Sequence, residues 1–209
     1  MAVSTRRRYS PRLPREERRE QLLDATLGLI SAEGFGAVSM EGVAREADIA
    51  KTVVYDAFAN QDALLQALFE REQERALSDI AAAIPTVPID GDPIDILIKS
   101  LTTVLEAVRS HADTWRLILL PADGTPPVIR SEVDRHRDLL IRQLEPIVAW
   151  GVKELGLDRL DPELTAHTIL AISENAARLT LTEPRRFTPR RLADFAADLL
   201  AAVVRRPRA

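Results

Sequence analysis

The sequence predicts an all-α protein of about nine helices, with a small N-terminal domain and a larger C-terminal domain. Three observations support this fold class. Apolar residues recur at intervals of three and four along most of the 209 residues, no segment sustains the alternation of a strand, and prolines and glycines fall between the periodic segments. Hydrophobic residues make up 46% of the chain, which is enough to build a core.

The composition narrows both the chemistry and the location of the protein. There is no cysteine, which excludes disulfides, thiolate zinc sites and cysteine nucleophiles. No apolar run approaches the ~18 residues that cross a bilayer. Pro11, Pro14 and a charged helix follow the basic start, where a signal peptide needs an apolar segment. We therefore expect a cytoplasmic protein with no membrane partner.

Charge is distributed unevenly along the N-terminal part. Residues 1–15 carry five arginines and no acid, and we expect them to form a disordered basic arm. Residues 16–83 hold six basic and fourteen acidic residues. A nucleic-acid contact from this part therefore needs the arm and a small cationic rim, because a broad basic patch is missing from the sequence.

A long helix and a short one are expected at the start of the N-terminal domain. The first begins at Pro14, which suits a first turn, and ends at Gly34 and Gly36. Ser39 is in place to cap a short second helix over 40–47.

Another short helix and another long one follow. The short one is expected over 50–58, with Val54 and Phe58 four residues apart on its inward side. Asn60 then caps a long helix over about 61–83.

Two short helices joined by about three residues bury little surface alone, and their common use is a helix-turn-helix, predicted here at 39–58. In that motif the first helix braces on the phosphates and the second enters the major groove. Lys51, Thr52 and Tyr55 fall on the side opposite the inward Val54. Lysine and threonine suit base edges, and tyrosine suits a phosphate. A plain helical hairpin with a solvated face is the alternative.

The C-terminal domain is expected at 84–209. Segment 84–93 holds three prolines and one glycine, so no helix crosses it. Pro146 should kink or split the longest helix of this domain. The helices predicted from the apolar spacing lie at about 93–110, 114–120, from 126 onward, 162–182 and 189–205.

Residues 16–76 resemble the DNA-binding domain of TetR-type (TetR/AcrR-like) transcriptional regulators. The matching stretches are QLLDATLGLISAEGFGAVSMEGVAREADIA and VVYDAFANQDALLQAL. The characteristic positions are Gly34–Phe35, Ser39, Val43–Ala44, the pair Tyr55 and Phe58, and Leu64–Leu65. The stretches LILLPADGTPPVIR and AARLTLTEPRRFTP look like the C-terminal domain of actinobacterial-type members, although that match is looser.

Three residues depart from the family pattern. Asp48 stands where the turn usually has glycine, Ala50 where a serine or threonine caps the second short helix, and Gln61 where a lysine grips phosphate. We expect weaker intrinsic electrostatics, partly offset by an arginine arm that follows the minor groove. The predicted DNA-binding residues are Ser39, Lys51, Thr52, Val53, Tyr55, Gln61, Arg12 and Arg15.

The last two helices are apolar over wide arcs, which predicts a dimer interface of two helices from each subunit. Two deeply buried helices of a monomer are the alternative. The family resemblance implies the same homodimer, bound to a pseudo-palindromic site on double-stranded DNA. The predicted interface residues are Ile169, Ile172, Ser173, Ala176, Leu192, Phe195 and Leu199.

The resemblance also implies a ligand pocket in the C-terminal domain, and the aliphatic core favours a hydrophobic small molecule. Polar or aromatic side chains on otherwise apolar helices are the candidates, although each also suits a core or surface position. These candidates are His111, Trp115, Arg116, Trp150, Asn175 and Arg178.

An enzyme is not expected, because the sequence has neither a glycine-rich phosphate loop nor a nucleophile elbow. The pairs Glu132/His136 and Glu163/His167 could share a metal, but hydrogen-bonded surface pairs are commoner, so no metal or cofactor is predicted. The sequence thus predicts a ligand-responsive homodimeric repressor. The alternative is a small-molecule-binding or protein-interaction protein with weak or lost DNA affinity, which the acidic surroundings of the second short helix favour.

Overall fold

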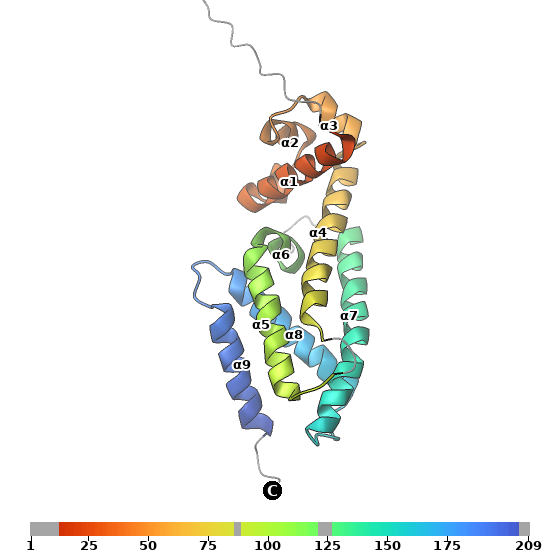
Figure 1. Cartoon of the computed structure of the whole chain (residues 1–209). Helices are drawn as coiled ribbons and strands as arrows, with labels where there is room; N and C mark the ends of the chain where they lie inside the picture. The colour runs from red at the N-terminus through yellow and green to blue at the C-terminus, as the bar shows by residue number, and fades with distance from the viewer. Residues whose placement is uncertain (1–12, 86–88, 121–126, 205–209) are drawn as a thin grey trace, which may run out of the picture. The chain divides into compact units, whose positions relative to one another are not determined.

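The computed structural model describes residues 13–85, 89–120 and 127–204, and over these ranges it is all-α, as predicted (Figure 1). None of the helices in these ranges is long and apolar enough to cross a membrane. The elements are α1 (Arg15–Glu33), a 3-10 turn (Phe35–Ala37), α2 (Met40–Glu46), α3 (Lys51–Ala57), α4 (Gln61–Ala83), α5 (Pro93–Ser110), α6 (Ala112–Leu119), α7 (Pro127–Glu154), α8 (Pro162–Leu181) and α9 (Pro189–Val204).

The helix boundaries lie close to the predicted ones, with one difference in α7. This helix is not split at Pro146, so the expected split is wrong, and a kink there stays a prediction. Proline removes one backbone hydrogen bond, but α7 packs along α8, and that packing supports the continuous helix.

The chain divides into two compact units, Met1–Leu68 and Phe69–Ala209, and the division falls inside α4. From the sequence, the DNA-binding domain was expected to end at residue 76, and the boundary was expected at the proline-rich segment 84–93. Composition marks where a helix stops, whereas the division depends on which side chains pack together. Because α4 contains neither glycine nor proline, it runs uninterrupted through the division.

The first unit has a core formed by α1, α2, α3 and the start of α4. Leu22, Val43, Val54 and Leu64 are fully buried there. Such side chains come from faces with helical spacing, and each contributes about 1.5–3 kcal/mol when it leaves water.

Two polar side chains of α1 fix the ends of the short helices. Gln21 donates to the carbonyl of Ala47 at 3.2 Å, at the end of α2. Arg19 donates to the carbonyl of Ala57 at 3.0 Å, and its guanidinium lies 4.3 Å from the centre of the Phe58 ring. The last carbonyls of a helix lack partners within the helix, so α1 both satisfies these groups and holds α3 in place.

The turn between α2 and α3 is a Schellman motif with aspartate at the left-handed position. Asp48 has a φ of 52°. The N–H of Ile49 donates to the carbonyl of Ala44 at 2.9 Å, and the N–H of Asp48 donates to that of Arg45 at 3.2 Å. This pair of bonds defines the motif. Aspartate therefore does adopt the conformation that glycine usually supplies.

The second unit is a bundle in which α5 packs against α8 and α9, and α7 and α6 pack against α8. Leu105, Val108, Trp115 and Ala177 belong to its buried core. The N-termini of α5 and α8 are capped in the same way. Asp92 and Asp161 accept backbone N–H groups of the first turn, and a proline follows each at the first helical position.

A buried carboxylate links α4 to α6 within the second unit. Glu72 is fully buried. It accepts from Thr114 Oγ1 at 2.5 Å, from Arg71 Nε at 2.8 Å and from Arg75 at 3.0 Å. A second link lies two turns further along α4, where Asp79 accepts from the Trp115 indole at 3.1 Å. These contacts fix α6 beside α4, where both helices line a cavity.

Candidate functional sites

The short helix α3 presents its polar side chains to solvent. Lys51, Thr52 and Tyr55 are exposed, with 47% of Tyr55 accessible, whereas Val54 is fully buried and Val53 is half-buried. The face of the predicted helix-turn-helix that would meet DNA is therefore accessible, and its opposite face anchors the helix. Contact with DNA by these residues stays a prediction.

Lys51 is held by two neighbours that the sequence analysis did not pair with it. Its ammonium forms an ion pair with Glu41 of α2, and both side chains are about half exposed. The same ammonium lies 5.5 Å from the centre of the Tyr55 ring. A cation over an aromatic ring is attracted to the ring face, so Lys51, Tyr55 and Glu41 form one cluster across α2 and α3.

The remaining predicted DNA-binding residues lie at helix starts. Ser39 caps α2, and its hydroxyl accepts from the N–H of Gly42 at 3.0 Å while retaining a hydrogen to donate. Gln61 is exposed as the first residue of α4. Arg15, which was assigned to the arm, is the exposed first residue of α1. Arg12 and the rest of the arm up to residue 12 lie outside the described residues.

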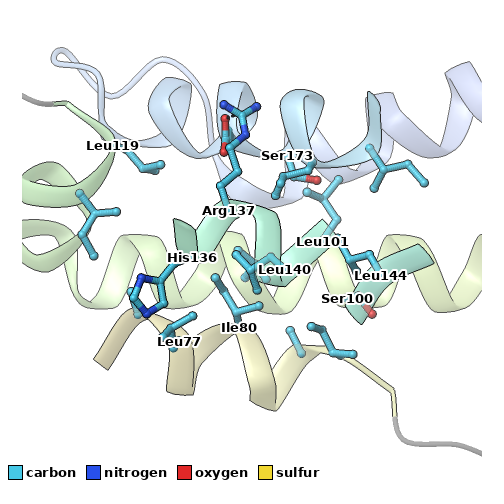
Figure 2. A pocket seen from close by; sticks show the side chains of 18 of the residues that line it. Leu77, Ile80, Ser100, Leu101, Leu119, His136, Arg137, Leu140, Leu144 and Ser173 are labelled. Atoms are coloured by element: carbon cyan, nitrogen blue, oxygen red, sulfur yellow. Dashed lines mark ion pairs between the residues drawn. The ribbon is translucent and has the colours of Figure 1, made fainter. Parts of the chain in front are cut away.

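The second unit contains a partly open cavity of about 340 Å³ between α4, α5, α6, α7 and α8. Figure 2 shows its aliphatic wall, to which α4 contributes Leu77 and Ile80, α5 contributes Leu101, and α7 contributes Leu140 and Leu144. A concave, mostly apolar space with a few polar groups is the usual form of a small-molecule site.

The polar groups of the cavity come mainly from α7 and α8. Arg137 lies 3.2 Å from the carboxylate of Glu174, and Arg178 lies 3.6 Å from the same carboxylate. On another side, His136 Nδ1 lies 2.5 Å from the side-chain nitrogen of Gln73 in α4. Figure 2 shows Arg137 extending toward α8 and His136 toward α4 beside Leu77.

Of the predicted ligand contacts, Trp115 and Arg178 line the cavity. The other four do not line this cavity, and their contact with a ligand stays a prediction. His111 forms an ion pair with Asp79, Arg116 lies near Asp113 and Glu183, Asn175 is exposed on α8, and Trp150 is half-buried outside the cavity wall.

Most of the cavity wall was not predicted from the sequence. Helical spacing indicates which face of a helix turns inward, but not where five inward faces leave a space. Residues such as His136, Arg137 and Glu174 carry no local signal that separates them from surface charges.

The predicted dimer-interface residues divide into two groups. Ile172, Phe195 and Leu199 are exposed, with 66% of Phe195 accessible, and Leu164, which was not predicted, is 67% exposed. The remaining four pack within their own unit, and their place in a dimer interface stays a prediction. Ile169 and Ser173 line the cavity, Ala176 is buried in the core, and Leu192 packs against that core.

The described side chains contain no group of three or more His, Asp or Glu placed to hold a metal ion. Glu163 and His167 are exposed on α8, and the side chain of Glu132 lies outside what the structure describes.

Comparisons with known proteins give a consistent result. Residues 22–68 match the sequence profile of "Bacterial regulatory proteins, tetR family". The HTH-type transcriptional repressor KstR of Rhodococcus jostii (strain RHA1) is 44% identical over 176 residues, which cover 80% of this chain and 81% of that protein.

Solved structures share the whole fold. A TetR-like transcriptional regulator from Rhodococcus sp. RHA1 has a TM-score of 0.75 and 26% identity, over 93% of this chain and 100% of that one. The transcriptional regulator FadR of Bacillus subtilis, solved in complex with stearoyl-CoA, has a TM-score of 0.64 and 18% identity, over 87% of this chain and 96% of that one.

Proposed function

The chain belongs to the tetR family of bacterial regulatory proteins and is a DNA-binding transcriptional regulator. From this premise we propose that it acts in the cytoplasm as a homodimeric repressor. In this proposal an apolar small molecule binds the repressor and releases it from its operator. The observation that supports this most is the pairing of two features in one chain. The helix α3 exposes Lys51, Thr52 and Tyr55, and a separate unit contains an apolar cavity.

In the proposed complex α3 enters the major groove. Lys51 donates to guanine or phosphate oxygens, Thr52 contacts a base edge or a thymine methyl, and Tyr55 donates to a phosphate. Val53 contacts a thymine methyl. Ser39 and Gln61, at the starts of α2 and α4, bind phosphates through their side chains and the N–H groups of the first turns. The arm with Arg12 and Arg15 adds charge along the minor groove.

Exposed apolar side chains on α8 and α9 support the homodimer. Leu164, Ile172, Phe195 and Leu199 are large hydrophobic side chains that are about half or more exposed. Large hydrophobic side chains left exposed together usually mark an interface. A second copy would cover them, and its two-fold symmetry would place two α3 helices about one helical turn apart on a pseudo-palindromic operator.

Release by an apolar effector is supported by the cavity. Its wall is aliphatic and is shared by five helices, including α4, which also belongs to the DNA-binding unit. A ligand that fits only one conformation of this wall shifts the protein toward that conformation. The FadR structure shows that a protein of the same fold holds stearoyl-CoA. Repression itself is inferred from KstR, a repressor with 44% identity.

One observation favours a second candidate, a small-molecule-binding protein with weak DNA affinity. The main cation of α3, Lys51, is already paired with Glu41. Asp48 and Asp56 are also exposed nearby in sequence. These acids reduce the attraction that phosphates provide.

A binding titration separates the two candidates. The intact protein is titrated against the DNA upstream of its own gene and against unrelated DNA of equal length, at several salt concentrations. The repressor binds its site at least about 10³-fold more tightly than unrelated DNA. Lys51→Ala lowers operator affinity about tenfold or more, whereas Lys99→Ala, the same charge change at an exposed position of α5, leaves it unchanged. Equal affinity for both DNAs supports the second candidate.

A further inference from the structure

The charged groups of the cavity are gathered on one side of it. Of the ionisable residues that line the cavity, Arg137, Glu174 and Arg178 lie together, and His136 faces Gln73 of α4 instead. The remaining wall is largely aliphatic (Figure 2). One end of a ligand would therefore meet charge, and the rest would meet hydrocarbon.

These three residues form a partly solvated rim. The side chains of Arg137 and Arg178 are each 42% exposed, and that of Glu174 is 18% exposed. The Nε of Arg178 also donates to the carbonyl of Leu119 at 3.2 Å, which joins α8 to the end of α6. A polar end group placed here stays close to water while an apolar skeleton lies inside.

Two guanidinium groups share a single carboxylate at this rim. Glu174 balances one positive charge, so the cluster keeps an excess of one. Each guanidinium carries five N–H donors in a planar fork. The contacts with Glu174 and with the carbonyl of Leu119 use only some of these donors. Arginine forks match carboxylate and phosphate oxygens well, and such charge-assisted bonds are stronger than neutral ones.

We propose that the effector is an amphiphile, an apolar skeleton that ends in an anionic group bound by Arg137 and Arg178. This rests on the proposed function, which supplies the effector site, and it adds the chemical class of the ligand. The anion can be a free carboxylate or the phosphates of a coenzyme A thioester, because both present acceptor oxygens to the same forks. A cluster that merely closes the cavity would bind neutral ligands equally well.

Matched ligands test this proposal on the intact protein. Straight-chain acids from octanoic to hexadecanoic are titrated beside the alcohols of equal length and the corresponding acyl-CoA thioesters. Calorimetry and the fluorescence of Trp115, which lines the cavity, report binding. The expected result is that the acids or the thioesters bind about tenfold or more tightly than the alcohols. The tighter of these two series identifies the source of the anion, and either result supports the proposal.

Two variants locate the anion. Arg137→Gln should lose about tenfold in affinity for the anionic series and none for the alcohols. Arg178→Gln should act in the same way, and it serves if the first variant folds poorly. Arg142→Gln, an exposed arginine on the same helix α7 but outside the cavity wall, is the matched control and should change neither.

The possible results distinguish a failure of the anionic ligand class from a failure of the proposed effector-controlled repressor. Alcohols that bind as tightly as acids, or an unaltered preference in both arginine variants, overturn the anionic class and leave an apolar effector standing. Failure of every series to bind overturns the class and the effector together. Operator titration of the same preparation reports on DNA binding independently.

Discussion

The α3 surface and the cavity both depend on charged side chains, but in opposite surroundings. Lys51 and Glu41 stand half in water, where an ion pair contributes about 0–1 kcal/mol and salt screens it. Glu72 of the second unit is fully buried, and it is balanced by arginines and a threonine hydroxyl. The exposed charges can act on a partner at little cost to the fold, whereas the buried charge belongs to the fold itself. Stability and DNA affinity should therefore respond to different residues.

Removing the buried carboxylate should give the largest effect. Glu72→Ala removes a fully buried carboxylate from its ion pairs with Arg71, which is largely buried, and with Arg75. Breaking a buried ion pair from one side costs about 3–5 kcal/mol. Both tryptophans, Trp115 and Trp150, lie in the second unit, so urea unfolding followed by tryptophan fluorescence reports on this unit.

The control for this experiment is the equally drastic loss of an exposed carboxylate. Glu145→Ala, at an exposed position of α7 in the same unit, should shift the same unfolding curve by less than about 0.5 kcal/mol. The smaller variant Thr114→Val, which removes one hydrogen bond to Glu72, should fall between the two at about 1–2 kcal/mol. Equal curves for Glu72→Ala and Glu145→Ala would contradict the contrast between buried and exposed charge.

The second prediction sharpens the exposed side of the comparison. Glu41→Gln removes the carboxylate that holds Lys51, so the ammonium can neutralise one more phosphate. Affinity for unrelated DNA should rise about three- to tenfold, and the slope of log affinity against log salt should steepen by about 0.9. Glu46→Gln is the same charge change at an exposed position of α2. It should raise the affinity for unrelated DNA by less and leave the slope of log affinity against log salt unchanged. Identical slopes for the two variants would show that Glu41 has no special hold on Lys51.

The two regions also differ in how far the sequence predicted them. The α3 surface depends on one helix of seven residues, so spacing alone separated the outward Lys51, Thr52 and Tyr55 from the inward Val54. Its partner Glu41 was missed because it lies ten positions earlier, in another helix. The cavity joins residues from Gln73 to Arg178, and its position depends on how five helices pack.

The dimer face shows the same limit within single helices. The sequence predicts that α8 and α9 are apolar on more than one side. Ile169 and Ala176 were expected on the outer side, whereas the structure turns them inward and exposes Leu164. Two apolar stripes on one helix look equivalent in sequence, and only the packing of α8 on α5 and α7 distinguishes them.

A third prediction concerns the N-terminus of α3. Ser39 accepts an N–H at the start of α2, whereas Ala50 at the start of α3 provides no side-chain cap. Ala50→Ser should stabilise α3 by about 0.5–1 kcal/mol, and Ser39→Ala should cost α2 about the same. Hydrogen exchange of the α2 and α3 amides measures both. Ala59→Ser, at an exposed position after α3, is the control and should not slow this exchange.

The smallest expected change in stability is at Asp48, and a second turn of the same type in the molecule serves as a comparison. The end of α7 repeats the Schellman motif, with the N–H of Leu157 donating to Val152 and glycine at the left-handed position, where Gly156 has a φ of 62°. An aspartate tolerates this conformation less well than glycine. Asp48→Gly should therefore stabilise the first unit by a few tenths of a kcal/mol, up to about 1 kcal/mol, while Asp48→Ala destabilises it. Gly156→Asp should cost the second unit a similar amount. If Asp48→Gly instead destabilises the first unit, the aspartate side chain must stabilise the turn by more than its backbone strain costs.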